Sequence, residues 1–257
     1  MPLHAQLIAL QTLLIKETLR FLRIWIQTLL PPAITTALYF IIFGNLIGSR
    51  LGSVDGLSYN QFIAPGLIMM AVITNAYSNV VSSFFSAKFQ RHIEEMLVSP
   101  LPNVIIVLGF IGGGTARGLA VGMVVTAVAL FFADLHWQHP FLTVAVILLT
   151  SVLFALAGLI NGIFAKSFDD ISLIPTFVLT PLTYFGGIFY SIQMLPPFWQ
   201  NASLFNPILY MVNAFRFGIL GVSDIDIRLA LILILLFIVA LFGSSLWLLH
   251  RGTGIRN

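Results

Sequence analysis

The sequence predicts an all-α membrane protein with six transmembrane helices, and three observations lead to that fold class. Hydrophobic residues make up 59% of the 257 residues and charged residues only 8%, against roughly 25% charged in an average soluble domain. The charged residues are separated by long runs that carry no charge. Alternating ten-residue segments, which are typical of a membrane β-barrel, are not visible. This small number of charged side chains cannot cover the surface of a protein in water. Most of the protein surface is therefore expected to face lipid.

The uncharged runs define the predicted crossings. A helix needs about 20 apolar residues to cross the hydrocarbon core, and helices are the natural spanning element because backbone groups must be paired there. All residues from 1 to 257 are expected to form a single transmembrane domain. The crossings are predicted near residues 24–47, 61–86, 104–132, 141–164, 171–192 and 229–249.

The segment 193–222 is predicted to be an outer re-entrant helical hairpin between the fifth and sixth crossings. Pro196 and Pro197 are expected to stop the fifth helix. Asn206 is a good N-cap, and Pro207 suits the first position of a new helix. The pieces 198–205 and 207–221 are each too short to cross a membrane, so they are expected to pack against protein.

Positive charges predict the orientation of the chain. With six crossings both termini share a side, and the side with more lysine and arginine is the cytoplasmic one. We therefore expect both termini in the cytoplasm. The side of the termini carries Lys16, Arg20, Arg23, Lys88, Arg91, Lys166, Arg251 and Arg256, and the opposite side carries Arg50, Arg216 and Arg228.

Residues 1–23 are predicted to form an amphipathic helix in the cytoplasmic interface, not a crossing. Its apolar residues fall near one helical face and its basic residues along another, which is typical of an interfacial helix. The alternative is a solvated basic leader that orients the first crossing. The apolar face is Leu3, Leu7, Leu10, Leu14 and Phe21, and the basic face is Lys16, Arg20 and Arg23.

Several kinds of chemistry are excluded by the sequence. There is no cysteine, which excludes disulfides, zinc–thiolate sites and a cysteine nucleophile. No lysine follows a glycine, so the phosphate-binding Walker A motif is absent, as are the common hydrolase and dinucleotide motifs. We therefore expect neither an enzyme nor a directly bound cofactor. His136 and His139 have only Asp134 as a neighbouring ligand, so a polar interfacial loop is preferred over a metal site.

Arg117 interrupts the third crossing, and a charge in a membrane segment raises a functional question. We expect Arg117 to lie near the inner headgroups, where it can snorkel, with a substrate or partner contact as the alternative. Gly114, Gly118 and Gly122 recur every fourth residue beside it. That spacing predicts a helix-packing face, within the protomer or across a dimer.

The loop 88–102 is the most charged segment. Lys88, Arg91, Glu94 and Glu95 lie on a short predicted helix that ends at Pro100. This pattern favours docking of a soluble partner on the cytoplasmic side, although an ordinary solvated loop is the alternative. The loop 166–170 could contribute to the same surface.

Taken together, these residues resemble the membrane subunits of type-2 ATP-binding cassette (ABC) transporters, the bacterial exporter permeases, and in particular the YadH-type permeases. The likeness covers nearly the whole chain, although His92-Ile93-Glu94 replaces the small residues often found before the matched glutamate. It rests on Arg91, Glu95, Leu97, Ser99 and Pro100 in the first cytoplasmic loop, and on Asn206, Pro207, Tyr210 and Arg216 after the segment 185–190 and Pro196.

The resemblance implies a half-transporter permease in the bacterial cytoplasmic (inner) membrane. Two permeases would form a homodimer with two copies of a cytoplasmic ATP-binding subunit, which would hold ATP and magnesium and dock on the loop 88–102. Membrane lipids are expected partners, and nucleic acid is not. The translocation path would be lined by the second and fifth helices, where Pro175 and Pro181 could ease bending. Polar residues there are Asn75, Tyr77, Asn79, Thr180, Thr183 and Tyr184, for which interhelical hydrogen bonding is the alternative role.

Two other classes remain open. A secondary transporter would normally need an intramembrane acid, and no Asp or Glu lies inside a predicted crossing. A sodium site built from neutral backbone groups would escape that argument. A membrane anchor without transport activity is the second alternative. The transported substrate is not indicated by the sequence.

Overall fold

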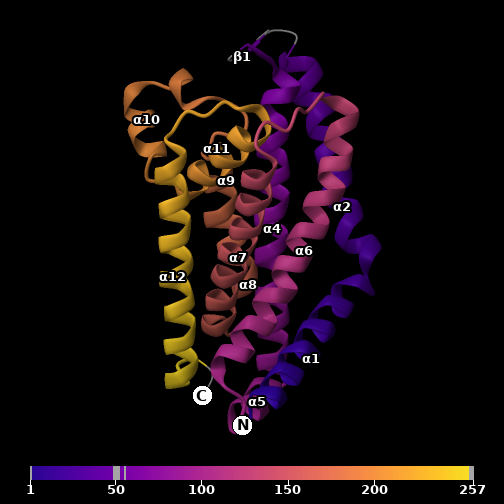
Figure 1. Cartoon of the computed structure of the whole chain (residues 1–257), viewed down its shortest axis with the longest axis vertical. Helices are drawn as coiled ribbons and strands as arrows, with labels where there is room; N and C mark the ends of the chain where they lie inside the picture. The colour runs from indigo at the N-terminus through magenta and orange to yellow at the C-terminus, as the bar shows by residue number, and fades with distance from the viewer. Residues whose placement is uncertain (1, 49–52, 55, 255–257) are drawn as a thin grey trace.

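The computed structural model describes residues 2–48, 53–54 and 56–254. The chain forms a helical bundle elongated along one axis (Figure 1). Helix α4 (Tyr59–Phe89) lies at its centre and packs against α6 (Asn103–Phe132) and α7 (Pro140–Phe164). Helix α12 (Ile227–Arg251) packs on α7 and on α11 (Pro207–Leu220). Helices α6, α7 and α11 therefore surround α4, and α12 packs on the outside of α7 and α11.

Five helices of the described residues are long and apolar enough to cross a membrane. They coincide with the first, second, third, fourth and sixth predicted crossings. The first is α2 (Trp25–Tyr39), which continues into the π-helix η1 (Phe40–Ile47). Ser58 and Gln61 begin α4 with a capping box, in which each side chain bonds the other's backbone amide. The five are Trp25–Gly44, Tyr59–Phe89, Asn103–Phe132, Pro140–Phe164 and Ile227–Arg251.

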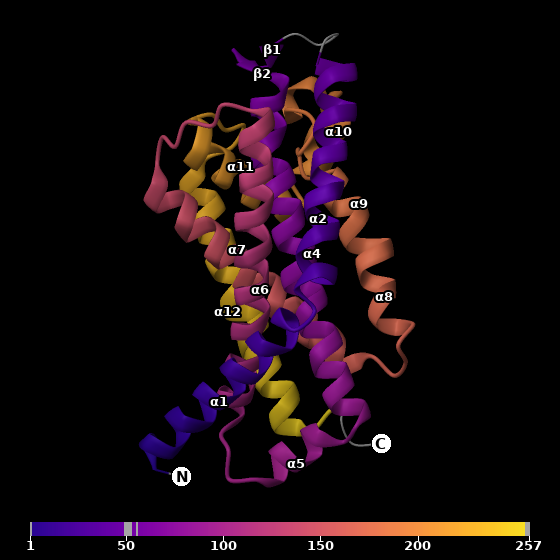
Figure 2. The same cartoon turned by 90° about the vertical axis from the view of Figure 1, so that its right-hand side faces the viewer.

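The fifth predicted crossing, 171–192, differs from the structure in length and regularity. It consists of α8 (Asp170–Ile174), the π-helix η2 (Pro175–Leu179) and α9 (Thr180–Tyr184), which rise beside the bundle (Figure 2). Proline has no backbone amide to donate to an α-helical hydrogen bond. After Pro175 the helix widens, and both the amide and the hydroxyl of Thr180 donate to the Pro175 carbonyl, five residues back. The helix also ends at Tyr184. The prediction that Pro196 and Pro197 stop it was wrong, because the chain turns at Gly187, whose φ is +70°.

The segment 193–222 holds the predicted short helices. Residues Ile192–Met194 form the 3₁₀-helix η3, followed by α10 (Pro197–Ser203) and α11. Asn206 caps α11 by accepting a hydrogen bond from the Ile208 amide, and Pro207 is its first residue. Both predicted roles are confirmed. Much of α11 is buried against α4, α7 and α12.

One small departure from an all-α fold lies before α4. Ser53–Val54 (β1) and Leu57–Ser58 (β2) pair antiparallel, with Ser53 opposite Ser58 and Val54 opposite Leu57. Arg50 and Arg256, two residues of the charge-based orientation, lie outside the described residues.

Helix α1 (Leu3–Leu22) confirms the predicted amino-terminal helix, and Phe21 of its predicted apolar face is buried against the bundle. It crosses the lower part of the bundle diagonally (Figure 2) and packs on α6. Its buried residues are Leu13, Glu17 and Phe21, whereas Leu3 and Leu7 are exposed. The inward side chains of α1 pack against α6, where glycine residues leave space for them.

Glycines on two faces of α6 provide that room. Gly114, Gly118 and Gly122 face α4 and α7, so the predicted packing face lies within the protomer. A methyl group at Gly118 would lie 3.0 Å from Ala76 and 3.1 Å from Ser151. A second face accepts α1, since a methyl group at Gly109 would lie 2.7 Å from Leu13 and one at Gly113 would overlap Glu17.

The two ends of the bundle differ. The start of α1, the helix α5 (His92–Val98) and the end of α12 lie at one end, and the β1–β2 hairpin and α10 lie at the other (Figure 1). We call these the α5 end and the α10 end. The structure thus brings the region of both termini to the same end as α5, as the predicted topology requires.

Candidate functional site

The α5 end presents a charged surface on a buried anchor. The chain reverses at Arg91, which has a φ of 64°, and α5 follows at once. Ile93 is fully buried among side chains of α4, α6, α7 and α12. Arg91, Glu94 and Glu95 are exposed. Three of the four residues predicted to dock a partner therefore point away from the protein.

Lys88, the fourth predicted docking residue, points inward. Its ammonium group donates hydrogen bonds to the carbonyls of Ile163 and Ala165, each at 2.7 Å. These carbonyls lie at the carboxyl end of α7, where a cation is favourable. Lys88 joins the ends of α4 and α7.

The loop after α7 lies beside the end of α4. The Phe168 ring packs edge-on against Phe85 at 4.9 Å between ring centroids and against Phe89 at 5.4 Å. The Asp170 carboxylate accepts hydrogen bonds from the amides of Lys166 and Ser167. These hydrogen bonds lower the pKa of Asp170 below its ordinary value. The loop 166–170 therefore adjoins the end of α4, and its predicted contribution to the docking surface stays a prediction.

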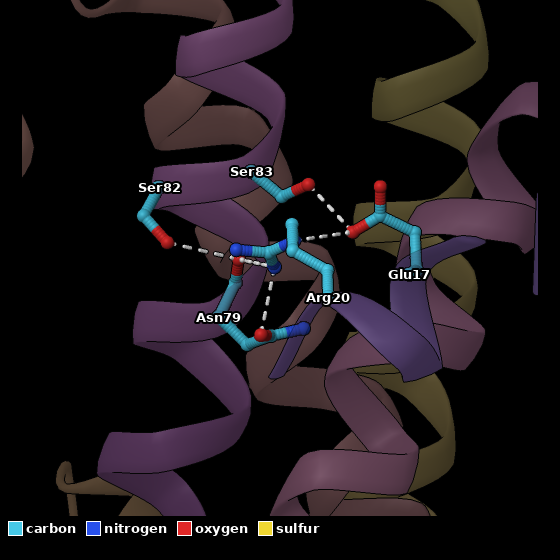
Figure 3. Close-up of polar contacts among 5 residues, drawn as sticks. All are labelled: Glu17, Arg20, Asn79, Ser82 and Ser83. Carbon is cyan, nitrogen blue, oxygen red and sulfur yellow. Dashed lines mark hydrogen bonds and ion pairs between the residues drawn. The ribbon is translucent and has the colours of Figure 1, made fainter. Parts of the chain in front are cut away.

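A polar cluster joins α1 to α4 (Figure 3). Glu17 is 1% exposed, and its carboxylate accepts hydrogen bonds from the Ser83 hydroxyl at 2.5 Å and from Arg20 Nε at 3.2 Å. The Nη2 of Arg20 donates to the backbone carbonyl of Asn79 at 3.0 Å and to its side-chain oxygen at 2.8 Å. Arg20 therefore lies on the packed side of α1, not on the predicted solvated face.

Sequence reasoning missed Glu17 altogether. The available signal was its position: Leu13, Glu17 and Phe21 are four residues apart, so they share one helical face. An acid between two apolar residues on a buried face requires polar partners.

Arg117 lies midway along α6. It is 14 residues from the start of α6 at Asn103, about 21 Å along the helix. Its Nη2 donates to the side-chain oxygen of Asn75 at 3.1 Å. The predicted position near the inner headgroups stays a prediction, because α6 has 30 residues and is longer than a crossing needs.

Asn75 and Arg117 border a cavity of about 300 Å³ between α2, α4 and α6. The α2 wall includes Pro31, Pro32 and Tyr39, and the α4 wall includes Met70. Most of the exposed cavity surface is apolar, but the cavity is also lined by Gln27, Thr28, Thr35, Thr36, Thr74, Asn75 and Arg117. Apolar surface with polar groups among it is the usual character of a small-molecule site.

The six predicted path residues do not form one surface. Asn75 borders the cavity, Asn79 holds Arg20, and Tyr77 is 2% exposed in the core. Thr180 and Thr183 bond carbonyls of their own helix, at Pro175 and Leu179. The Tyr184 hydroxyl lies 3.0 Å from that of Tyr39 on α2.

The four residues of the carboxy-terminal pattern are structural contacts at the α10 end. Asn206 Nδ2 donates to the Leu182 carbonyl at 2.6 Å, and the Tyr210 hydroxyl donates to the Leu204 carbonyl at 2.8 Å. Arg216 is 1% exposed, donates to the Gly187 carbonyl at 2.5 Å and lies 4.0 Å from the centre of the Phe62 ring. With Pro207 starting α11, these contacts hold the segment 182–220 together.

His139 is used in packing. Its backbone amide donates to the Gly218 carbonyl at 2.8 Å, and its ring stacks on Phe217 at 4.9 Å between centroids. Among the described residues no group of three or more histidines and acids is placed to hold a metal ion.

The family model described as "ABC-2 type transporter" matches residues 8–220, so the chain belongs to the ABC-2 type transporter family. It is 59% identical over 256 residues to the "Inner membrane transport permease YadH" of Escherichia coli (strain K12), covering 99% of this chain and 100% of that protein. It is also 28% identical over 215 residues to "Nodulation protein J" of Rhizobium leguminosarum bv. viciae, covering 83% of each chain. The resemblance predicted from the sequence is confirmed, and the family supports a permease role.

Proposed function

We propose that the chain is the membrane-spanning permease subunit of an ATP-driven exporter in the bacterial inner membrane. Its α5 end faces the cytoplasm and docks a separate ATP-binding subunit, which holds ATP and magnesium. A homodimer of permeases with two such subunits is the working unit. The inner-membrane location is carried over from the name of the E. coli relative.

The observation that carries this proposal is the construction of α5. Four residues, Arg91, His92, Glu94 and Glu95, expose polar or charged side chains, whereas Ile93 is fully buried. A short charged helix suits electrostatic docking of a soluble partner. The buried Ile93 fixes α5 to the bundle, so a force on α5 is transmitted to the bundle. The chain also lacks a Walker A motif, so the nucleotide chemistry belongs to another polypeptide.

The topology proposed with this function has six crossings and a re-entrant hairpin at 193–222. The helical pieces from Asp170 to Tyr184 serve as a short fifth crossing, and the segment through α10 and α11 returns on the outer side. Buried packing of α11 supports this arrangement, because irregular backbone within a membrane is tolerated only against protein.

Motion of the ATPase subunits would reach the bundle by two routes. One is α5 itself, which is continuous with α4 through Arg91. The other is α1, which the Glu17–Arg20 cluster fastens to α4. Binding of ATP drives a shift between inward-open and outward-open states only if ATP binds the two states with different affinity.

Charge reversal on α5 tests the docking. We expect the double variant Glu94→Lys with Glu95→Lys to reduce co-purification of the ATPase from the neighbouring reading frame by about tenfold or more, since like charges across an interface cost several kcal/mol. Transport-linked ATP hydrolysis should fall with it. The matched control is Asp134→Lys, an exposed acid at the opposite end. Wild-type recovery and hydrolysis in the double variant would show that α5 is not the docking surface.

The rival function is a secondary transporter without an ATPase partner. Glu17 gives this rival the buried acid that the predicted crossings lacked. Its partners, Ser83 and Arg20, favour a fixed structural role instead. Liposomes that contain the permease alone and accumulate substrate down an ion gradient would support the rival.

A further inference from the structure

We propose that the cavity between α2, α4 and α6 binds a small amphiphile with one anionic group, held by Arg117. The ligand class is a single phosphate, sulfate or carboxylate on a short apolar body. This site does not depend on ATPase docking, and only the question of whether its occupant is transported rests on the proposed function.

The charge of Arg117 has no acid to balance it. Arg117 makes no ion pair with any described residue, and its guanidinium donates a hydrogen bond to the neutral side chain of Asn75, at 3.1 Å. Its Nε atom is buried without a hydrogen-bond partner in the described part of the chain. A cation midway along a membrane helix is costly unless it meets an anion or a polar cavity.

The surrounding charges also favour binding of an anion at Arg117. Glu17 is taken up by Arg20 and Ser83. Arg20 and Arg117 bond asparagines one turn apart on α4, Asn79 and Asn75, so their like charges repel each other. The three ionisable groups of this region therefore sum to one net positive charge, which an anionic ligand would neutralise.

The cavity walls define the rest of the ligand. Pro31, Pro32 and Met70 provide apolar surface, and Thr74 adds a hydroxyl near Asn75. About 300 Å³ is at the lower limit of typical ligand pockets. That size admits a headgroup with a short length of chain, and because the cavity is open on one side a longer chain can extend out of it. Guanidinium geometry suits phosphate and carboxylate oxygens because its donors form a planar fork.

Direct binding tests the site. Protein in nanodiscs of phosphatidylcholine is titrated with radiolabelled dodecyl phosphate, and binding to empty nanodiscs is subtracted. We expect Arg117→Gln to weaken binding by about tenfold or more, because a hydrogen bond to a charged group contributes at least that factor. The matched control Arg228→Gln removes an exposed arginine outside the cavity and should leave the affinity unchanged.

Two further measurements keep the test decisive. Ala71→Phe fills the cavity from α4 without changing charge and should also abolish binding, with folding checked by gel filtration and thermal melting. Dodecyltrimethylammonium, a cation of similar length, should not compete. Equal affinity in wild type and Arg117→Gln, or equal competition by the cation, would overturn the proposal.

The source of the occupant is decided by two additional arms. An anionic lipid that co-purifies with the wild type and not with Arg117→Gln identifies the bilayer as the source. ATP-dependent movement of dodecyl phosphate in proteoliposomes with the ATPase subunit identifies cargo. Failure of the Glu94/Glu95 test with retained binding would reject the proposed function and leave the anion site standing.

Discussion

Helix α4 receives two arginines one helical turn apart, and the two contacts differ in one respect. Asn79 accepts Arg20 from α1, and Asn75 accepts Arg117 from α6. Arg20 is also paired with the carboxylate of Glu17, whereas Arg117 has no acid among the described residues and borders a cavity. Asn79 therefore takes part in a contact whose charges are paired within the protein, whereas Asn75, one turn away, binds an arginine that pairs with no described acid, at the edge of a cavity.

The difference shows how a membrane bundle can include charge. The Glu17–Arg20 pair is charge-compensated, hydrogen-bonded at Ser83 and Asn79, and seated against Gly113. Buried charge of this kind is tolerated when it is paired and hydrogen-bonded. Arg117 has no paired acid among the described residues, so its function is expected to involve a molecule from outside the chain.

Removal of Glu17 should have the largest effect on stability. Glu17→Ala leaves Arg20 and Ser83 without their shared acceptor, and we expect a loss of about 3 kcal/mol in the free energy of unfolding, the lower end for breaking a buried pair, because Arg20 is partly exposed. Denaturant unfolding in detergent measures it. Glu17→Gln, which can still accept from Ser83, should lose less. A Glu17→Ala protein as stable as wild type would mean that the cluster does not hold α1.

A methyl group at the α1 seat should have the next largest effect. Gly113→Ala places a carbon atom against Glu17 and pushes α1 away from α6, for an expected loss of about 2 kcal/mol. Gly243→Ala on α12 is the matched control, since no atom lies within 4 Å of the added carbon. Equal stability of the two variants would contradict tight seating of α1.

Loss of the Arg117 charge should change stability least. Arg117→Gln keeps an amide that can donate to Asn75, and no ion pair is broken, so we expect a change below about 1 kcal/mol. The same unfolding measurement, in nanodiscs of neutral lipid, checks it. A loss as large as that of Glu17→Ala would show that Arg117 is part of the closed structural contact, and the comparison would fail.

Much of the fold was predictable because its signals are local. Charges end the crossings, and the side-chain oxygen of Asn206 and the ring of Pro207 determine the start of α11 by their own geometry. The glycine spacing at Gly114, Gly118 and Gly122 predicted close helix packing for the same reason. The early end of α9 was not predictable from Pro196, because the turn at Gly187 comes first.

The candidate site was predicted less well because its side chains depend on distant partners. The direction of Lys88 follows from two carbonyls of α7, and the inward direction of Arg20 from Asn79 on α4. An amphipathic pattern places every charge on the outer face, so it cannot reveal a charge that a polar partner draws inward. The docking role of Arg91, Glu94 and Glu95 stays a prediction.

The Lys88 contact makes α4 and α7 share a base at the α5 end. A tilt imposed at that end is applied to both helices. Because the helices are long, a small tilt angle moves their far ends by a large distance. Helix α4 has 31 residues, about 46 Å at 1.5 Å per residue, so a rotation of roughly 10° about its base displaces its far end by about 8 Å. Small angular changes beneath the bundle are therefore large translations at the α10 end.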